Sequence, residues 1–302
     1  MLIDSSEVYN FIVDKAETRL DKYVVEKCPE LSRTQVQKLI ADGEVTVNDE
    51  TVRASLKLGA GDRVSVRVSI SPPPTPSPEA IPLSILYEDD DLLVIDKPSG
   101  LTIHPAPGSP NHTLVNAVLS HVPSLPETDD AMRPGIVHRL DKDASGVMVV
   151  AKNSAAQQNL ISQFKSRSVV KAYTVLVKGQ LTPDDGVIEA PVGRDPRHRK
   201  KMAVVEGGRE ARTNYHVMQH WDDFTLLEVR PETGRTHQIR VHLSAIGYPV
   251  VGDRIYGVKS ARVPRLFLHA TRLGFKLPSS GQYVEFTSEL PPDLAEALEN
   301  LA

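Results

Sequence analysis

Cysteine is almost absent from this sequence of 302 residues: Cys28 is the only one, and it has no second cysteine with which to form an internal disulfide. A disulfide framework and a cysteine-based metal site are therefore excluded, and nothing points to an oxidising compartment. Aromatic residues make up only 5% of the chain, so its hydrophobic cores must depend on valine, leucine and isoleucine.

Long apolar runs are also lacking. No stretch reaches the roughly 18 consecutive apolar residues that a membrane span requires, and the N-terminal segment holds Asp4, Glu7 and Asp14 but no early basic cluster. We therefore expect neither a secretory signal nor a membrane association, and we expect the protein to be cytoplasmic.

Positive charge is not in excess overall, because 39 acidic residues outnumber 35 basic ones and give a net charge of −4. The distribution is uneven, however, since residues 131–272 hold 23 lysines and arginines against 13 acidic residues. A basic region inside an acidic protein suits a localised surface that binds phosphate groups. Chance clustering of charge is the alternative interpretation.

Five prolines among ten residues mark the clearest boundary, in the segment SPPPTPSPEA at residues 71–80. Such a segment favours an extended, semi-rigid spacer. The sequence therefore predicts a small module at residues 1–70, a proline-rich linker at 71–80 and a larger domain at 81–302.

The small module combines helical spacing with strand-like alternation. Ser32, with Gln35 three residues later, predicts a capping box at the start of the second of two helices, and Gly43 suits the end of that helix. Arg33 and Lys38 fall on the exposed side of the helix pair. Two short helices followed by strands resemble the RNA-binding module that a small-subunit ribosomal protein shares with several RNA-modifying enzymes. The resemblance implies that Arg33 and Lys38 contact RNA; a solvated charged face is the alternative.

Strands predominate in the larger domain. Apolar runs predict strands at residues 92–95, 147–151, 173–177, 224–229 and 283–286, and helical spacing predicts helices at 114–121, from 154 onward and at 236–246. Most connections are too short or irregular for repeated right-handed crossovers. The expected fold class is α+β, with a mixed, largely antiparallel sheet and flanking helices, plus the small N-terminal α/β module.

A polar, charged loop leads directly into one of these strands. It reads GIVHRLDKDASG at residues 135–146, with Asp141 between Arg139 and Lys142. A loop that is held by a buried strand is a common way to fix one carboxylate at a cleft, and flanking positive charge suits an ionised nucleophile or base. A surface turn with local ion pairs is the alternative.

Three further segments hold candidate site residues. Alternation along KAYTVLV, residues 171–177, places Tyr173 on an apolar face, where it is either a core residue or a ring that stacks on a base turned out of RNA. In GRTHQIRVH, residues 234–242, Arg240 lies near the start of a helix that Thr236 can cap. The helix dipole repels a cation there, so Arg240 needs an anionic partner such as a carboxylate or phosphate. No acidic residue accompanies the two histidines of this segment, and we expect no metal site.

The segment RDPRHRKK, residues 194–201, has lysine or arginine at five of its eight positions. We expect phosphate contacts from Arg197, Arg199 and Lys200. A solvated loop without contacts is the alternative.

HRLDKDASG, KAYTVLV, and GRTHQIRVH followed by PVVGD resemble, in order and spacing, the signature motifs of the RluA-type pseudouridine synthases. With the N-terminal module the resemblance is to the RluD kind, which acts on large-subunit ribosomal RNA, and it covers about residues 16–298. One departure is Ala144, where the family usually has threonine; it bears only on the packing of the loop.

The resemblance implies roles for individual residues. Asp141 matches the catalytic aspartate, Arg139 the arginine that helps displace the target base, and Tyr173 the tyrosine that contacts the uracil. Arg240 matches the arginine that pairs with the aspartate, and Ile239 and Leu268 match apolar wall residues. No cofactor is expected, because the isomerisation needs no metal, nucleotide or redox group. The expected partner is structured RNA, foremost large-subunit ribosomal RNA, bound by a monomer.

Two other functions stay open on the residues alone. One is an RNA-binding assembly factor without activity, although such a protein needs neither Asp141 nor Tyr173. The other is a carboxylate-based glycoside or nucleoside hydrolase, which usually requires two carboxylates near the scissile bond. The motifs supply only Asp141, apart from its neighbour Asp143. Release of free uracil from RNA would distinguish a hydrolase from an isomerase.

The basic segment 194–201 gives a first testable prediction. Replacing Arg197, Arg199, Lys200 and Lys201 by alanine should weaken RNA binding, because phosphate contacts are lost. The slope of log affinity against log salt should fall by roughly 0.7–0.9 for each lost contact. Filter binding over a salt series measures this slope, and an unchanged slope would mean that the segment is only solvated surface.

Overall fold

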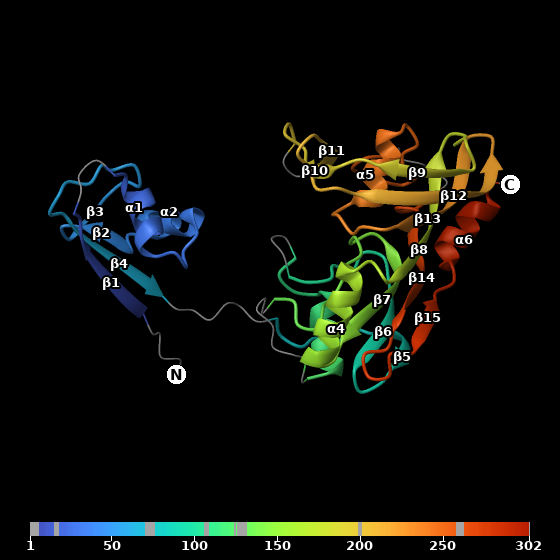
Figure 1. Cartoon of the computed structure of the whole chain (residues 1–302), viewed down its shortest axis with the longest axis horizontal. Coiled ribbons are helices and arrows are strands. Elements are labelled where there is room, and N and C mark those ends of the chain that lie inside the picture. The colour runs from blue at the N-terminus through green and yellow to red at the C-terminus, as the bar shows by residue number, and fades with distance from the viewer. Residues whose placement is uncertain are drawn as a thin grey trace. The chain divides into compact units, whose positions relative to one another are not determined.

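The computed structural model describes residues 6–14, 18–69, 76–105, 109–123, 125, 132–198, 201–257 and 263–301. The chain divides into two compact units, residues 1–74 and 75–302 (Figure 1). Of the linker predicted at residues 71–80, residues 71–75 lie outside the described residues, and residues 76–80 form neither helix nor strand. Among the residues that the structure describes, no helix has the length and apolar character that crossing a bilayer requires.

The N-terminal unit is a four-stranded antiparallel sheet with two helices. The strand order is β1 (Ser6–Ile12), β4 (Arg63–Ser69), β2 (Val45–Val47) and β3 (Glu50–Thr51), and the helices are α1 (Leu20–Lys27) and α2 (Arg33–Ala41). The capping box at the start of α2 is confirmed, since the Ser32 hydroxyl accepts from the Gln35 amide and the Gln35 side chain accepts from the Ser32 amide. The sequence did not predict β1, because apolar residues lie on both of its faces: Val8 and Ile12 are exposed.

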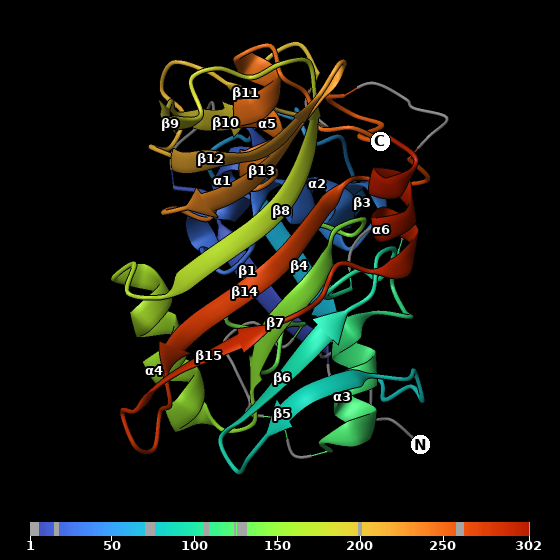
Figure 2. The same cartoon turned by 90° about the vertical axis from the view of Figure 1, so that its right-hand side faces the viewer.

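The C-terminal unit is built on one large sheet of nine strands (Figure 2). The order is β5 (Ser84–Glu88), β6 (Leu92–Lys97), β7 (Ser145–Ala151), β14 (Leu268–Lys276), β8 (Val170–Lys178), β13 (Phe224–Pro231), β12 (Arg212–Trp221) and β9 (Asp185–Glu189), with β15 (Tyr283–Thr287) paired to β14. Within the described residues β7 and β14 form the one parallel pair of this sheet. A short hairpin of β10 (Val192–Arg194) and β11 (Met202–Val204) lies apart from it. The predicted α+β class with a mixed, largely antiparallel sheet is confirmed.

Helices cover both faces of the sheet, so central strands are apolar on both sides. Alternate residues of β6 pack into different core clusters: Leu93 and Ile95 with residues of α3 (Leu114–His121), and Leu92 and Val94 with residues of α4 (Ser154–Lys165). The helix α5 (Gln238–Ala245) adds to the first cluster, and α6 (Pro292–Glu299) packs against a third cluster that includes Leu176 of β8. This double burial explains the continuous apolar run that predicted β6.

The strand β14 lies at the middle of the sheet, yet no periodic pattern predicted it. Its pairing with β8 shifts register between Ala270 and Arg272, which breaks the alternation of inward and outward residues. Gly274 interrupts the apolar pattern further. A bulge of this kind hides a strand from any search for period-two alternation.

Gly146 is the residue that lets β7 approach β14. Its φ is +115°, and a Cβ placed on it would lie 2.2 Å from the carbonyl oxygen of Ala270. Gly146 pairs directly with Ala270 in the parallel ladder. Only glycine fits this contact, and the contact fixes the C-terminal end of the loop at residues 135–146.

We predict that Gly146→Ala will destabilise the protein more than Gly100→Ala. Gly100 also has a positive φ, of +86°, but a Cβ on it would meet nothing within 4 Å. Gly100→Ala, the control, should therefore lower the free energy of unfolding by about 1–2 kcal/mol, because of its backbone conformation alone. Gly146→Ala should lower it further, because the added methyl group must push β7 and β14 apart. The free energy of unfolding in urea measures both, and equal losses would contradict the close approach.

Candidate active site

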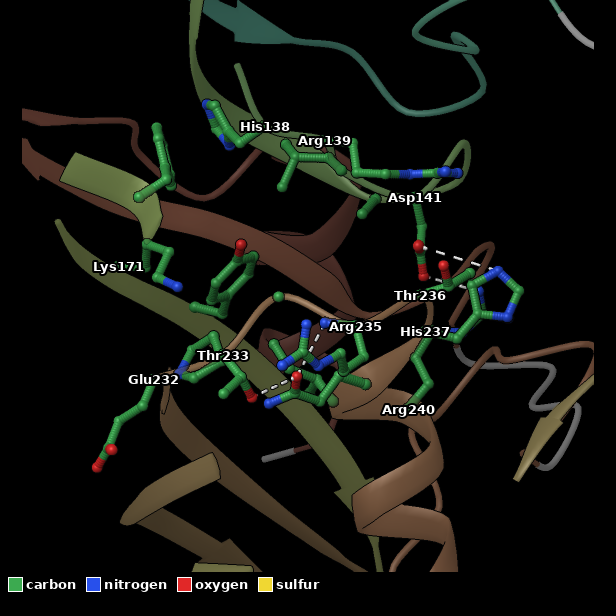
Figure 3. Close-up of a pocket in the computed structure, with 18 of the residues that line it drawn as sticks. His138, Arg139, Asp141, Lys171, Glu232, Thr233, Arg235, Thr236, His237 and Arg240 are labelled. Atoms are coloured by element: carbon green, nitrogen blue, oxygen red, sulfur yellow. Dashed lines mark hydrogen bonds and ion pairs between the residues drawn. The ribbon is translucent and has the colours of Figure 1, made fainter. Parts of the chain in front are cut away.

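A cavity of about 630 Å³ lies where the loop before β7, the strand β8 and the start of α5 meet (Figure 3). Six residues singled out in the sequence line it, from four separate segments of the chain: Arg139, Asp141, Tyr173, Ile239, Arg240 and Leu268. The fold thus gathers the three motifs around one space of a size that suits a nucleotide.

A buried arginine joins two carboxylates at one end of the cavity. The Arg240 side chain is 5% exposed, and its Nη1 donates to Asp141 Oδ2 over 2.8 Å. Its Nε and Nη2 donate to the two oxygens of Asp253, over 2.7 and 2.8 Å. Burial alone would lower the pKa of Arg240, but the hydrogen bonds to Asp253 and the charges of both carboxylates raise that pKa instead. The helix start therefore has the anionic partners that its dipole requires.

Asp253 is itself held by the backbone. Its Oδ1 accepts from the amides of Ile255 and Tyr256, over 2.8 and 3.1 Å. Burial would raise the pKa of Asp253, but Arg240 and these amides keep it below the ordinary value. The sequence did not reveal this role, although an aspartate closing the apolar segment PVVGD was a signal that it would be buried and in need of a partner.

A second buried cation supports the loop that carries Asp141. Lys97, at the end of β6, is fully buried, and its Nζ donates to the carbonyl oxygens of Pro98, Leu101 and Lys142, over 2.7, 3.0 and 3.2 Å. Burial lowers the pKa of Lys97 to about 7. The Gly100 amide donates to the same Lys142 carbonyl over 2.8 Å. Hydrogen bonds to its carbonyl therefore hold Lys142, the residue next to Asp141, against the segment after β6. The sequence analysis did not predict this contact.

Tyr173 serves the core and the cavity together. It lies on β8, packs against the largest core cluster and lines the cavity. Burial raises the pKa of its phenol, and the charge of Asp141 raises it further. The phenol is therefore protonated at neutral pH and can act as a hydrogen-bond donor or as an apolar ring.

Positive side chains surround the rest of the cavity. They are Arg139, Lys165, Arg167, Lys171, Arg209 and Arg235, and none of them forms an ion pair within the described residues. Burial and Arg167 together lower the pKa of Lys171 to about 8. Figure 3 shows Lys171 and Glu232 across the cavity from Asp141 and His237. Unpaired cations around a cavity suit a polyanionic ligand.

Other predicted contact residues lie away from this cavity or outside the described part. Arg197 is exposed between β10 and β11, whereas Arg199 and Lys200 lie outside the described residues. In the N-terminal unit Lys38 is exposed, and Arg33 bonds to the buried carboxylate of Asp21 over 2.8 Å. Arg19 shares that carboxylate, and its hydrogen bond is the largest of several that lower the pKa of Asp21. No cluster of side chains that could hold a metal ion occurs in the described ranges.

The predicted start of α5 was wrong. The helix begins at Gln238 rather than at Thr236, and Thr236 does not cap it. His237 occupies the position before the first helical residue, in the left-handed conformation with φ 56° and ψ 22°. This turn directs the His237 ring toward Asp141, with Nε2 4.0 Å from Asp141 Oδ1.

Comparisons with known proteins agree with this geometry. The sequence profile of the RNA pseudouridylate synthase family matches residues 91–245, and that of the S4 domain matches residues 18–64. An RNA pseudouridine synthase of Bacillus subtilis, described as uncharacterized, is 45% identical over 296 residues, which cover 95% of each chain. The ribosomal large subunit pseudouridine synthase D of Nitrosomonas europaea is 44% identical over 94% of this chain and 84% of its own length.

A solved structure shows the same fold. The human RNA pseudouridylate synthase domain containing 1 superposes with a TM-score of 0.58 and 31% sequence identity, over 70% of this chain and 85% of its own.

We predict that Asp253→Asn will lower the free energy of unfolding by about 3 kcal/mol or more, because it leaves a buried arginine with one carboxylate fewer. Asp293→Asn is the matched control. Asp293 also binds an arginine through two bonds, from Arg265, but it is 42% exposed. Because this carboxylate is exposed to solvent, the pair should contribute at most about 1 kcal/mol. Urea unfolding measures the free energy of unfolding of both variants. Similar losses in the two would show that burial does not strengthen the pair of Arg240 and Asp253.

Proposed function

This chain belongs to the RNA pseudouridylate synthase family, and from that premise we propose that it converts specific uridines of large-subunit ribosomal RNA into pseudouridine, with Asp141 as the catalytic carboxylate. The protein is an RNA pseudouridine synthase, an isomerase. The ribosomal target is supported by relatives of closely similar length that are named ribosomal large subunit pseudouridine synthase D. The S4 domain match supports a second RNA contact.

One observation carries the catalytic role of Asp141. Its Oδ2 is bonded to Arg240, while its Oδ1 accepts no hydrogen bond from the described residues and faces the cavity beside His237. One oxygen is thus held and the other is available to the substrate. An ionised carboxylate so placed can act on the ribose, as a nucleophile or as a base.

The reaction places simple demands on the site. The bond between uracil N1 and ribose C1′ breaks, the uracil rotates, and a bond from C5 to C1′ forms. N1 gains a proton and C5 loses one, so atoms and charge balance without a co-reactant. Ile239 and Leu268, both buried, contribute apolar wall to the cavity. Such walls exclude water, which would otherwise release free uracil.

The target nucleotide has to leave its stack to reach Asp141, at a cost of roughly a few kcal/mol. Arg139 is exposed and lines the cavity. Its position suits a side chain that displaces the target base and occupies the vacated space. Tyr173 also lines the cavity and offers a ring for the uracil.

Binding of the RNA backbone is assigned to positive side chains. The unpaired cations of the cavity take the phosphates near the target, and Arg197, Arg199 and Lys200 bind phosphates farther along the RNA. Arg33 and Lys38 give the N-terminal unit its own phosphate contacts. A monomer suffices, because one unit supplies every residue of the cavity, and we propose action in the cytoplasm.

The geometry disfavours a hydrolase. Such an enzyme usually needs two carboxylates at the scissile bond. Asp253 is the carboxylate that shares Arg240 with Asp141, but its side chain is 0% exposed and both of its oxygens are bonded to Arg240. Asp143 is exposed and does not line the cavity. Glu232 also lines the cavity, but it is paired with Arg212 and Asn214 and lies across the cavity from Asp141 (Figure 3). No carboxylate next to Asp141 is therefore free to serve as a second catalytic group.

Asp141→Asn is the test of this function. The change keeps the size of the side chain but removes its charge, so pseudouridine formation should fall to background while RNA binding persists. Asp143→Asn, two residues away, should stay active. Position-resolved mapping of pseudouridine in large-subunit RNA measures both, together with thermal unfolding, because Arg240 loses one anionic partner. Substantial activity in a folded Asp141→Asn protein would contradict the mechanism.

A further inference from the structure

Two cavity residues with side chains have a positive φ: Arg167, at 61° just after the end of α4, and His237, at 56° with a ψ of 22°. Only His237 of the two lies beside Asp141. This conformation costs a residue other than glycine roughly 1–3 kcal/mol, and it persists only where the surroundings enforce it. Figure 3 shows the ring beside Asp141. A strained residue that points at the candidate catalytic carboxylate calls for a functional explanation.

A hydrogen-bond chain fixes which ring nitrogen carries the proton. The Tyr256 hydroxyl oxygen accepts from the Met202 amide over 2.8 Å and lies 2.8 Å from His237 Nδ1. The amide can only donate. If Nδ1 donated as well, the phenol proton would have no acceptor among the described residues, so we assign that proton to Nδ1. Burial lowers the pKa of His237 below its ordinary value, which favours the neutral ring. A neutral ring that accepts at Nδ1 carries its proton on Nε2.

The His237 Nε2–H therefore points toward Asp141 Oδ1, but the two atoms are 4.0 Å apart. That distance is too long for a direct hydrogen bond. An oxygen about 2.8 Å from each atom would see them at an angle of roughly 90°, which suits a hydroxyl group that bonds to both. The group between them must donate to the carboxylate and accept from the ring.

Within an RNA chain one group meets both requirements. The uracil N3–H can only donate, and the uracil carbonyls and the phosphate oxygens can only accept. The 3′ and 5′ oxygens are esterified. The ribose 2′-hydroxyl both donates and accepts, and it is the group that distinguishes RNA from DNA.

We propose that His237 and Asp141 together bind the 2′-hydroxyl of the target ribose, so that His237 determines the preference for a ribonucleotide. The hydroxyl donates to Asp141 Oδ1 and accepts from His237 Nε2. This inference rests on the proposed function, and it places the ribose against the carboxylate that acts on it. Tyr256 is a positioning residue: its hydroxyl orients His237, and its ring lies 5.1 Å from the Arg240 guanidinium.

The test combines a substrate change with a protein change. A uridine that the wild-type protein converts is first mapped, and a short RNA is made with either uridine or 2′-deoxyuridine at that position. Single-turnover rates of the wild type should fall about 10- to 100-fold on the deoxy substrate, as expected for a hydrogen bond to a charged group. In His237→Asn the hydroxyl loses the bond from the ring but keeps the bond to Asp141, so the additional loss on the deoxy substrate should become about 3- to 10-fold smaller than in the wild type.

Asparagine is chosen because it tolerates the left-handed conformation, while its shorter side chain does not extend to the place of Nε2. His112→Asn is the matched control. His112 has the same φ of 56° but is exposed and does not line the cavity. This variant should discriminate as the wild type does.

Tyr256→Phe supplies a second, milder variant, which decides the question if His237→Asn proves unfolded by thermal denaturation. Tyr256→Phe keeps the ring over Arg240 but removes the hydroxyl that bonds to His237 Nδ1. Discrimination between uridine and 2′-deoxyuridine should fall to a value between those of the wild type and His237→Asn, and RNA affinity should not change. The double variant His237→Asn, Tyr256→Phe should discriminate between the two substrates no better than His237→Asn alone. Discrimination equal to that of the wild type would contradict the proposed contacts from Tyr256 through His237 to the hydroxyl.

Two results would overturn the inference. Equal wild-type rates on both substrates would mean that a water molecule, and not the ribose, lies between the two side chains. A deoxy penalty as large in His237→Asn and Tyr256→Phe as in the wild type would mean that other residues bind the hydroxyl. Neither result touches the proposed function, which fails if the wild type converts no uridine of large-subunit RNA or if a folded Asp141→Asn protein keeps substantial activity.

Discussion

The buried guanidinium of Arg240 is the contact on which the cavity depends. Without it, Asp141 and Asp253 would be two carboxylates sharing one buried place. With it, each is compensated, and the planar fork of the guanidinium fixes the direction of both. The arrangement is anchored at each end, since Ile239 and Leu243 hold α5 in the core and the amides after Asp253 hold its carboxylate. The reactive side chain thus takes its orientation from the sheet and helix around it.

The loop of Asp141 is constrained from the other direction as well. Lys97 and Gly100 hold the carbonyl of Lys142, and Gly146 brings the end of the loop against β14. A carboxylate that is held through its own oxygen and through the backbone on its C-terminal side has little freedom. Rigid support of this kind is what places a reacting group within a fraction of an ångström of its target.

The sequence predicted those features that depend on local pattern. The bounds of α3, the capping box of Ser32 and the buried strand β6 all follow from residues close in the chain. The resemblance of the motifs also implied that Arg240 pairs with Asp141, as the structure shows. What escaped prediction depends on distant contacts: Lys97 meets a carbonyl 45 residues away, and a bulge conceals β14. The cap expected from Thr236 failed because the backbone turns left-handed at His237, which no periodicity signals.

The place of β14 in the sheet has a consequence for synthesis. This strand pairs with β7 on one side and β8 on the other, and its residue Leu268 forms part of the cavity wall. It is the last of the cavity's elements to be translated, because the loop of Asp141, β8 and α5 all precede it in the chain. A nascent chain that has emerged only as far as α5 still has an unpaired edge on both β7 and β8. During synthesis the cavity is therefore completed only when β14 is added to the sheet. A chain that stops before residue 268 contains every predicted catalytic side chain but lacks the strand that joins β7 to β8.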